Sequence, residues 1–183
     1  MRSGLNIELD ADGIDDLVRQ FEATPAQLEA AMRSTYGRMG RWLRTQAVRG
    51  LSQKLGIQQK ILRSRVRAFR MQGGIASARV GSKVWFGLNP IPLSRLRPRK
   101  APKGVRAQGG RYVEGAFLAN IRGRQQVMRR TGPARLPLEV VYADIEDPSQ
   151  VYIEDVLIGS DAFEAQFLRT LEHEIKWRTR TLG

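Results

Sequence analysis

Cysteine is absent from this sequence, and histidine occurs once among its 183 residues. Without cysteine the chain can form no disulfide, use no catalytic thiolate and build no cysteine-ligated zinc site. The single imidazole, His173, stands between two glutamates in a predicted helix and has no second histidine with which to share a metal ion. We therefore interpret it as an exposed helical side chain and expect neither a metal nor another cofactor.

The common catalytic and membrane patterns are missing as well. Neither GxxxxGK[ST] nor a GxGxxG after a strand occurs in the chain. The acids Asp144, Glu146 and Asp147 lie together, but they precede a predicted helix, where negative charge favours the N-terminus. No uncharged run approaches the roughly 18 residues of a membrane span, and the first residues lack the apolar core of a signal peptide. These absences predict a protein that is not an enzyme and has no membrane partner.

Acidic residues are scarce in one long part of the chain. Residues 33–136 contain 25 Lys and Arg but a single acid, Glu114, so that their net charge is +24. Residues 1–32 carry −5 and residues 137–183 carry −6, which leaves +13 for the whole chain. Blocks of charge on this scale indicate a polyanionic partner or self-complementary assembly. The alternative is a basic surface that only keeps the protein soluble.

Hydrophobic periodicity predicts a single α+β domain, in which long amphipathic helices pack on an antiparallel β-sheet with a long basic loop between strands. The expected parts are an acidic N-terminal segment (1–23), basic helices (24–66), the antiparallel sheet (67–143) with its loop (92–111), and C-terminal helices (147–180). Thr24, Pro25 and Gln27 are typical of a helix start. The predicted core residues are Met32, Met39, Trp42, Leu43, Phe163, Phe167 and Leu171.

Two groups of basic residues are candidate contacts for nucleic acid or a neighbouring subunit. Arginines fall opposite the apolar stripe of the first long helix, at Arg33, Arg38, Arg41, Arg44 and Arg49. The second group lies in the segment 92–111, which has three prolines and three glycines but no acid, and comprises Arg95, Arg97, Arg99, Lys100, Lys103, Arg106 and Arg111. A DNA contact, a seam between subunits and a solvated loop all remain open for this segment. We expect Leu93 and Leu96 to anchor its base.

The stretch VEGAFLANIRGRQQVMRRTGPARLPLEVVYADIEDP, residues 113–148, resembles the minor tail protein Z family of long-tailed, non-contractile phages, also called tail-completion proteins. The matching pieces are GAF, VMRR and LPLEVV; in the family they form a strand that ends in Gly-Ala-Phe, a strand with Val-Met before arginine, and a proline-led strand into a helix. The residues that carry the match are Gly115, Ala116, Phe117, Val127, Met128, Arg129, Leu136, Pro137, Leu138, Glu139 and Val140. A basic first helix, a basic middle segment and a C-terminal helix follow the same order.

The resemblance implies a virion structural protein that acts late in tail assembly. It implies a homo-hexameric ring at the head-proximal end of the tail, assembled in the host cytoplasm, that supports head–tail joining and positions the genome end. Its partners would be the tail terminator or tube, the head-side connector and, without sequence readout, genomic DNA. The alternative function is a non-specific basic nucleic-acid-binding protein that acts as a monomer or dimer.

Overall fold

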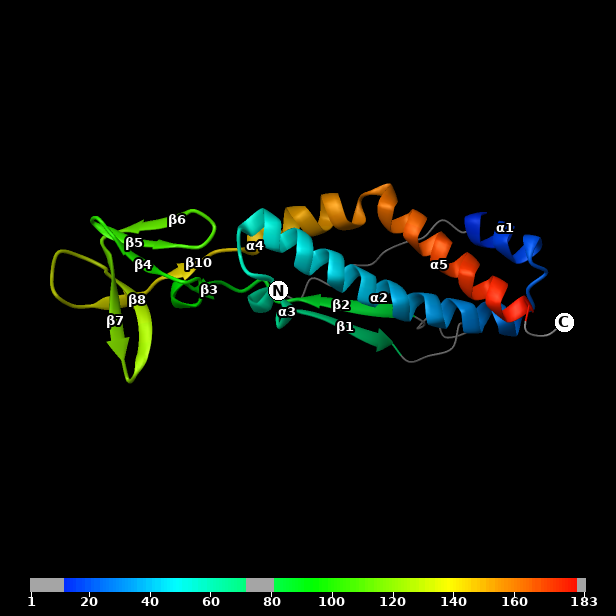
Figure 1. Ribbon diagram of the computed structural model, residues 1–183, viewed down its shortest axis with the longest axis horizontal. Coiled ribbons are helices and arrows are strands. Elements are labelled where there is room, and N and C mark those ends of the chain that lie inside the picture. Colours follow the sequence, from blue (N-terminus) through cyan, green and yellow to red (C-terminus); the bar gives the residue numbers. More distant parts are fainter. Residues whose placement is uncertain (1–11, 72–80, 181–183) are drawn as a thin grey trace. The chain divides into compact units, whose positions relative to one another are not determined.

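The computed structural model describes residues 12–71 and 81–180 (Figure 1). The stretches LNIELDA (residues 5–11) and IASARVG (residues 75–81) each predict a strand. The first lies outside the described residues, and so does most of the second. The chain is α+β, with several small antiparallel sheets, as the sequence predicts. That the long helices pack on a sheet stays a prediction.

The residues gather into two compact units, which we call unit 1 and unit 2. Unit 1 comprises Met1–Ala47, Val66–Phe86 and Ile153–Gly183, and unit 2 comprises Val48–Arg65 and Gly87–Tyr152. The sequence predicts one domain, and that also stays a prediction. Each unit is described by itself below.

Unit 1 is built mainly from helices. Its elements are α1 (Asp12–Gln20), α2 (Pro25–Leu55, through Ala47), β1 (Val66–Met71), β2 (Gly81–Phe86) and α5 (Asp161–Arg180). Helices α2 and α5 lie side by side, and α1 contacts α5 (Figure 1). Strands β1 and β2 form an antiparallel pair in which Val66 lies opposite Phe86.

A capping box begins α2, as the sequence predicts. The backbone N–H of Thr24 donates to Oε1 of Gln27 at 2.8 Å, and the N–H of Gln27 donates to Oγ1 of Thr24 at 3.3 Å. Pro25 occupies the first helical position, where its missing N–H costs no helical hydrogen bond. Two of the backbone donors that a helix start leaves unpaired are thus satisfied.

Thr24→Ala is expected to lower the free energy of unfolding by about 1 kcal/mol, because it removes the hydroxyl that accepts from the Gln27 N–H. Thermal unfolding followed by circular dichroism measures the change. The control is Thr45→Ala in the middle of α2, where Oγ1 of Thr45 bonds back to the Arg41 carbonyl and alanine is the better helix former. An equal loss in both variants would contradict the cap assignment.

The predicted core of unit 1 is largely confirmed. Met39, Leu43, Phe163, Phe167 and Leu171 are buried. The rings of Tyr36 and Phe167 lie 5.7 Å apart between centroids, and those of Trp42 and Phe163 lie 6.2 Å apart. The prediction is less accurate for Met32 and Trp42, which are only half-buried.

Unit 2 holds short strands and helices. Its helices are α3 (Gln59–Arg63), the 3-10 turn η2 (Leu93–Arg95) and α4 (Glu146–Val151), which the π-helical turn η3 (Tyr152–Ile158) follows. Its strands are β3 (Ile91–Pro92), β4 (Arg99–Ala101), β5 (Gly104–Ala107), β6 (Arg111–Glu114), β7 (Ala116–Ile121), β8 (Arg124–Arg130), β9 (Leu138–Val140) and β10 (Tyr142–Ala143). They form the antiparallel sheets β4-β5-β6 and β7-β8-β9 and the pair β3-β10, so the strands do not join into one sheet.

Two helix boundaries differ from the prediction. The stretch GIQQKILRSRVRAF predicts a second helix that ends near Arg65, but only the five residues of α3 are helical. Helix α2 ends at Leu55, and Gly56 follows with φ +62°. Helix α4 begins at Glu146, before the expected Asp147–Pro148 start. The N-cap residue is Ile145, which offers no side-chain cap, but Oδ1 of Asp144 accepts from the Glu146 N–H at 3.0 Å and satisfies the first N–H of the helix.

The prediction of a long basic loop over residues 92–111 is wrong. The segment folds into η2, β4, β5 and the start of β6. Two residues, Pro102 and Lys103, connect β4 to β5, and Lys103 adopts φ +57°. Gly109 and Gly110 both have positive φ in the turn between β5 and β6. The prolines and glycines therefore end strands and make tight turns, whereas composition alone predicts one long loop.

Candidate polyanion-binding surface

The positive charge of the chain is concentrated in unit 2. Its residues include 17 Lys and Arg against 5 Asp and Glu, which gives a net charge of +12. The residues of unit 1 include 14 Lys and Arg against 13 Asp and Glu, which gives +1. Residues 12–32 and 153–180, the larger described parts of the two acidic end segments, belong to the same unit as the arginine-rich first part of α2. Polyanions are therefore expected to meet unit 2.

The arginines of the predicted helix face are exposed, but several of them have partners within unit 1. Arg33 pairs with Glu29 at 2.9 Å, and Arg38 pairs with Glu174 at 2.6 Å. Nε of Arg44 donates to the Val66 carbonyl at 2.9 Å. The other two members of the set are also exposed: Arg41, and Arg49 in the part of α2 that belongs to unit 2. This helix face thus contributes to the structure of unit 1 as well as to its charge.

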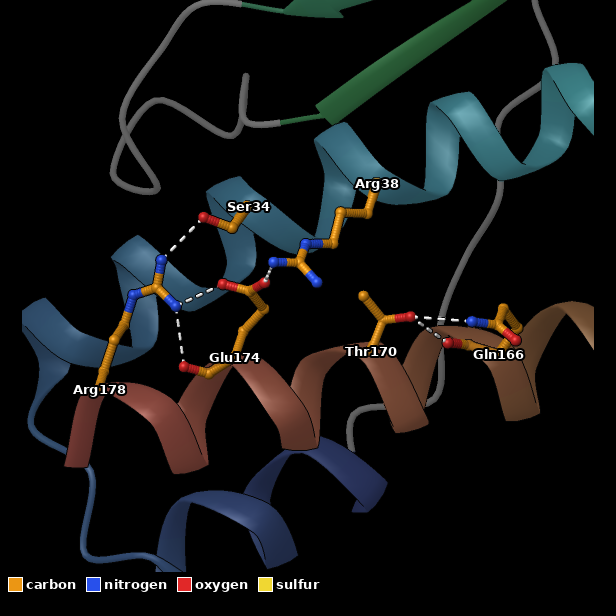
Figure 2. Close-up of polar contacts among 6 residues, drawn as sticks. All are labelled: Ser34, Arg38, Gln166, Thr170, Glu174 and Arg178. Atoms are coloured by element: carbon orange, nitrogen blue, oxygen red, sulfur yellow. Dashed lines mark hydrogen bonds and ion pairs between the residues drawn. The ribbon is translucent and has the colours of Figure 1, made fainter. Parts of the chain in front are cut away.

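A buried carboxylate organises the polar contacts between α2 and α5 (Figure 2). Glu174, with 5% of its side chain exposed, contacts Arg38 through Oε1 and Arg178 through Oε2, at 2.5 Å for the latter. Arg178 also donates to its own helix, at the Glu174 carbonyl, and to Oγ of Ser34 at 2.8 Å. One carboxylate therefore holds two cations, and the guanidinium of Arg178 joins the two helices.

Two of the seven cations in the segment 92–111 donate hydrogen bonds to other residues of the protein. Nη1 of Arg111 donates to the carbonyls of Leu55 and Gln108, and its burial lowers the pKa of the guanidinium. The guanidinium of Arg97 donates to the amide oxygen of Gln58 at 2.7 Å when the amide is oriented to accept it. These two arginines tie the segment to residues 55–58 of unit 2.

Leu93 and Leu96 are fully buried, as the sequence predicts for the anchors of this segment. The remaining cations are exposed and have no acidic partner within the described residues: Arg95, Arg99, Lys100, Lys103 and Arg106. Four of them lie on or beside the sheet β4-β5-β6.

One face of the sheet β4-β5-β6 presents a row of cationic and aromatic side chains. Arg99 lies opposite Arg106, and Arg106 lies opposite Tyr112. All three are exposed, and the Arg106 guanidinium lies 5.8 Å from the centroid of the Tyr112 ring. Like charges directly across two strands repel each other and destabilise the pair. A phosphate between the two guanidinium groups would relieve that repulsion.

Most of the residues that carry the family resemblance lie in the sheet β7-β8-β9. Ala116, Arg129 and Glu139 form one cross-strand row, with a 2.7 Å ion pair between Arg129 and Glu139. Phe117, Met128 and Val140 form the next row.

The position of the Gly-Ala-Phe piece in its strand differs from the family pattern. Gly115, with φ +70°, precedes β7, so the Gly-Ala-Phe piece begins a strand and does not end one. Val127 and Met128 are buried in β8. Leu136 and Pro137 lead into β9, where Leu138 is exposed, and α4 follows β10.

Arg95 lines a surface hollow of about 400 Å³ together with residues that the sequence did not single out, among them Arg124 and Tyr142. The sequence gives only a weak indication of these residues, namely the alternation along β8. Their position beside Arg95 depends on contacts between residues more than 25 positions apart. His173 is exposed on α5, as the sequence predicts, and lines a second hollow in unit 1 with Trp42 and Arg169.

Within the described residues, no cluster of three or more His, Cys, Asp or Glu side chains could hold a metal ion. Over the same residues, no helix has both the length and the apolar character that a bilayer crossing requires. No protein-family model, no curated protein and no solved structure matches the chain. We therefore infer the function from the chain's own residues and from the resemblance carried by residues 113–148.

Proposed function

We propose that the chain is a structural protein of a phage virion, a tail-completion protein that forms a hexameric ring at the head-proximal end of the tail. In this role it joins the tail terminator or tube to the head-side connector. The genome end lies near its basic surface. The protein carries out no chemical reaction in this role.

The concentration of charge in unit 2 supports this proposal best. A ring around a DNA passage needs a surface that attracts phosphates without reading bases. The exposed face of Arg99, Arg106 and Tyr112, with Lys100 and Lys103 beside it, offers cations that have no carboxylate partner within the described residues. The residues of the family resemblance, gathered in β7-β8-β9, support the assignment to the tail.

The deciding experiment is immunogold electron microscopy of the virions whose genome encodes the chain. Gold particles at the head-proximal end of the tail are expected. Labelling at the distal tip, or no labelling of intact virions and isolated tails, would overturn the proposal. Light scattering of the purified chain at low and high salt tests the ring, and assembly is expected to weaken as salt screens the charges between acidic and basic surfaces.

The same charge supports a second candidate, a non-specific nucleic-acid-binding protein that acts as a monomer or dimer. This candidate predicts DNA binding by small particles and no labelling of virions. Molar mass from light scattering and the position of the gold label together separate the two functions.

The quadruple variant Arg99→Gln, Lys100→Gln, Lys103→Gln and Arg106→Gln is expected to weaken duplex DNA binding and flatten its salt dependence. The slope of log K against log salt should fall by about 3 to 4 if all four cations contact phosphates, since each contact contributes roughly 0.9. Filter binding or fluorescence anisotropy at roughly 50 to 200 mM salt measures this slope.

The matched control removes the same charge from unit 1, at the exposed residues Arg41, Arg67, Arg169 and Arg180. This variant is expected to keep most of the salt dependence, because unit 1 is nearly neutral before the change. Equal loss in the two variants would show that net charge, and not the surface of unit 2, determines the affinity.

A further inference from the structure

The hollow beside Arg95 lies in unit 2, where η2 contacts β8. Its volume of about 400 Å³ falls within the range of roughly 300–1,000 Å³ that small-molecule sites occupy. The lining includes two arginines, two glutamines, a serine and a tyrosine, and it includes no acidic residue. A hollow with this lining favours an anionic ligand.

Local structure explains how these side chains reach one place. Arg124 and Gln126 are two residues apart in β8, so they lie on the same face of the strand. The Val141 N–H donates to the Val127 carbonyl at 2.9 Å, which extends the pairing of β8 toward β10 and brings Tyr142 alongside. Ser94 and Arg95 come from η2, which directly follows β3, the strand that pairs with β10.

The two arginines at this hollow have no anion of their own. Arg95 and Arg124 are exposed, and neither forms an ion pair within the described residues. A third cation, Arg65, is close. Burial lowers the pKa of Arg65 by desolvation, and the nearby charge of Arg95 lowers it further. Arg65 itself is occupied, because it donates to the carbonyls of Gly87 and Asn89. Arg95 and Arg124 are therefore the cations at the hollow that an anionic ligand can contact.

The other side chains suit a nucleotide better than a bare phosphate. Tyr142 is 55% exposed at the hollow, so a face or edge of its ring is accessible to a planar partner. Oγ of Ser94 donates to Oε1 of Gln126 at 3.3 Å, which leaves the amide NH₂ group of Gln126 without a hydrogen bond within the described residues. That group is a neutral donor for a phosphate or a base.

We propose that this hollow binds one unpaired nucleotide of single-stranded DNA, with its phosphate on the guanidinium groups of Arg95 and Arg124 and its base on the ring of Tyr142. The choice of DNA over RNA rests on the proposed function, whereas the assignment of a nucleotide site to the hollow does not. A duplex would not place a base here, since its bases are paired and stacked inside the helix and only its phosphates reach a shallow hollow. Arg99 and Arg106 are exposed neighbours on paired strands and suit the phosphates of a duplex.

The test measures fluorescence anisotropy of a labelled 12-nucleotide oligo-dT and of a labelled blunt 20-base-pair duplex with the full chain. The double variant Arg95→Gln and Arg124→Gln is expected to weaken oligo-dT binding at least 10-fold and to lower its salt slope by about 1.4, from two contacts at roughly 0.7 each. Tyr142→Leu is expected to weaken oligo-dT binding by roughly 5- to 100-fold with the salt slope unchanged, because stacking is lost and no charge is removed.

Two matched controls lie on the other sheet of the same unit. Arg99→Gln with Arg106→Gln removes the same charge, and Tyr112→Leu removes an aromatic ring of similar exposure. The charge control is expected to weaken duplex binding more than oligo-dT binding, and Tyr112→Leu is expected to leave oligo-dT binding within about 3-fold. Cooperative thermal unfolding of each variant confirms that it is folded.

The proposal is overturned if the variants at the hollow lose oligo-dT binding no more than the controls, or if they lose duplex binding by the same factor. If the variants at the hollow lose the same factor of affinity for oligo-dT and for oligo-rU, the nucleotide site is retained without a preference for DNA.

Whether the hollow binds a nucleotide is independent of whether the chain is a virion protein. Virions without the gold label, together with intact oligo-dT binding at the hollow, would reject the tail function and leave the nucleotide site in place.

Discussion

Phe167→Ala is expected to lower the free energy of unfolding by about 4 kcal/mol. Phe167 is 1% exposed and packs against the ring of Tyr36, so truncation removes apolar burial and leaves a cavity between α2 and α5. Burial raises the pKa of Tyr36 by desolvation, since the phenolate is the less favourable form in an apolar environment. Water that enters the new cavity is expected to move the pKa of Tyr36 back toward its usual value.

Urea denaturation measures the loss of stability. Ultraviolet absorbance during a pH titration follows all four tyrosines, and subtraction of the titration of the matching Tyr36→Phe variant isolates Tyr36. The control is Trp177→Ala on the same helix, where the indole is 61% exposed and contacts the guanidinium of Arg178 at 5.3 Å. That variant is expected to lose about 1 kcal/mol or less. If Trp177→Ala cost as much as Phe167→Ala, the assignment of the core to this face of α5 would be incorrect.

Glu174→Ala is expected to lower the free energy of unfolding by about 3 kcal/mol. The carboxylate contacts Arg38 and Arg178 at once, and only 15% of the Arg178 side chain is exposed (Figure 2). Its removal leaves the largely buried Arg178 guanidinium without a counter-ion, although Ser34 and a backbone carbonyl still accept from it. Exposed ion pairs contribute about 0–1 kcal/mol, so the burial of this carboxylate accounts for the larger value.

The matched control is Glu172→Ala, which makes the same change of charge two residues earlier on α5, where no ion pair forms within the described residues. Chemical denaturation of both variants at low and high salt gives the comparison. The loss at Glu174 is expected to persist at high salt, because buried pairs are screened much less than exposed ones. A loss that salt abolishes, or one equal to that of Glu172→Ala, would show that the pair acts as an exposed one.

The basic middle of the chain shows where composition misleads. Three prolines, three glycines and seven cations between residues 92 and 111 favour an open loop, yet the same residues form η2, two strands and part of a third. Val105 is buried in β5, so the segment contributes to the interior of unit 2. Two turns of only two or three residues need Lys103, Gly109 and Gly110 at positive φ. Such short hairpins leave little length for the alternating pattern by which strands are recognised.

The charge-bearing residues divide in a way that no local pattern reveals. Arg97, Arg99 and Arg111 are alike in the sequence, but Arg97 and Arg111 hold the segment to residues 55–58 while Arg99 stays exposed. The difference depends on partners about 40 to 55 positions away in the chain. Sequence spacing carries no information about partners at that distance.

By itself, the sequence determined the features that depend on near neighbours. Thr24 and Gln27 set the start of α2, the four-residue spacing of Phe163, Phe167 and Leu171 set the buried face of α5, and the segments of alternating residues after residue 66 set antiparallel strands. Capping bonds, helical period and strand alternation act within a few residues, so they can be read from the order of residues alone. The tertiary structure alone decided how charge is divided between the units and which cations remain available. It brought Arg95, Arg124 and Tyr142 to one hollow, because that requires strand pairing across about 30 to 50 positions of chain.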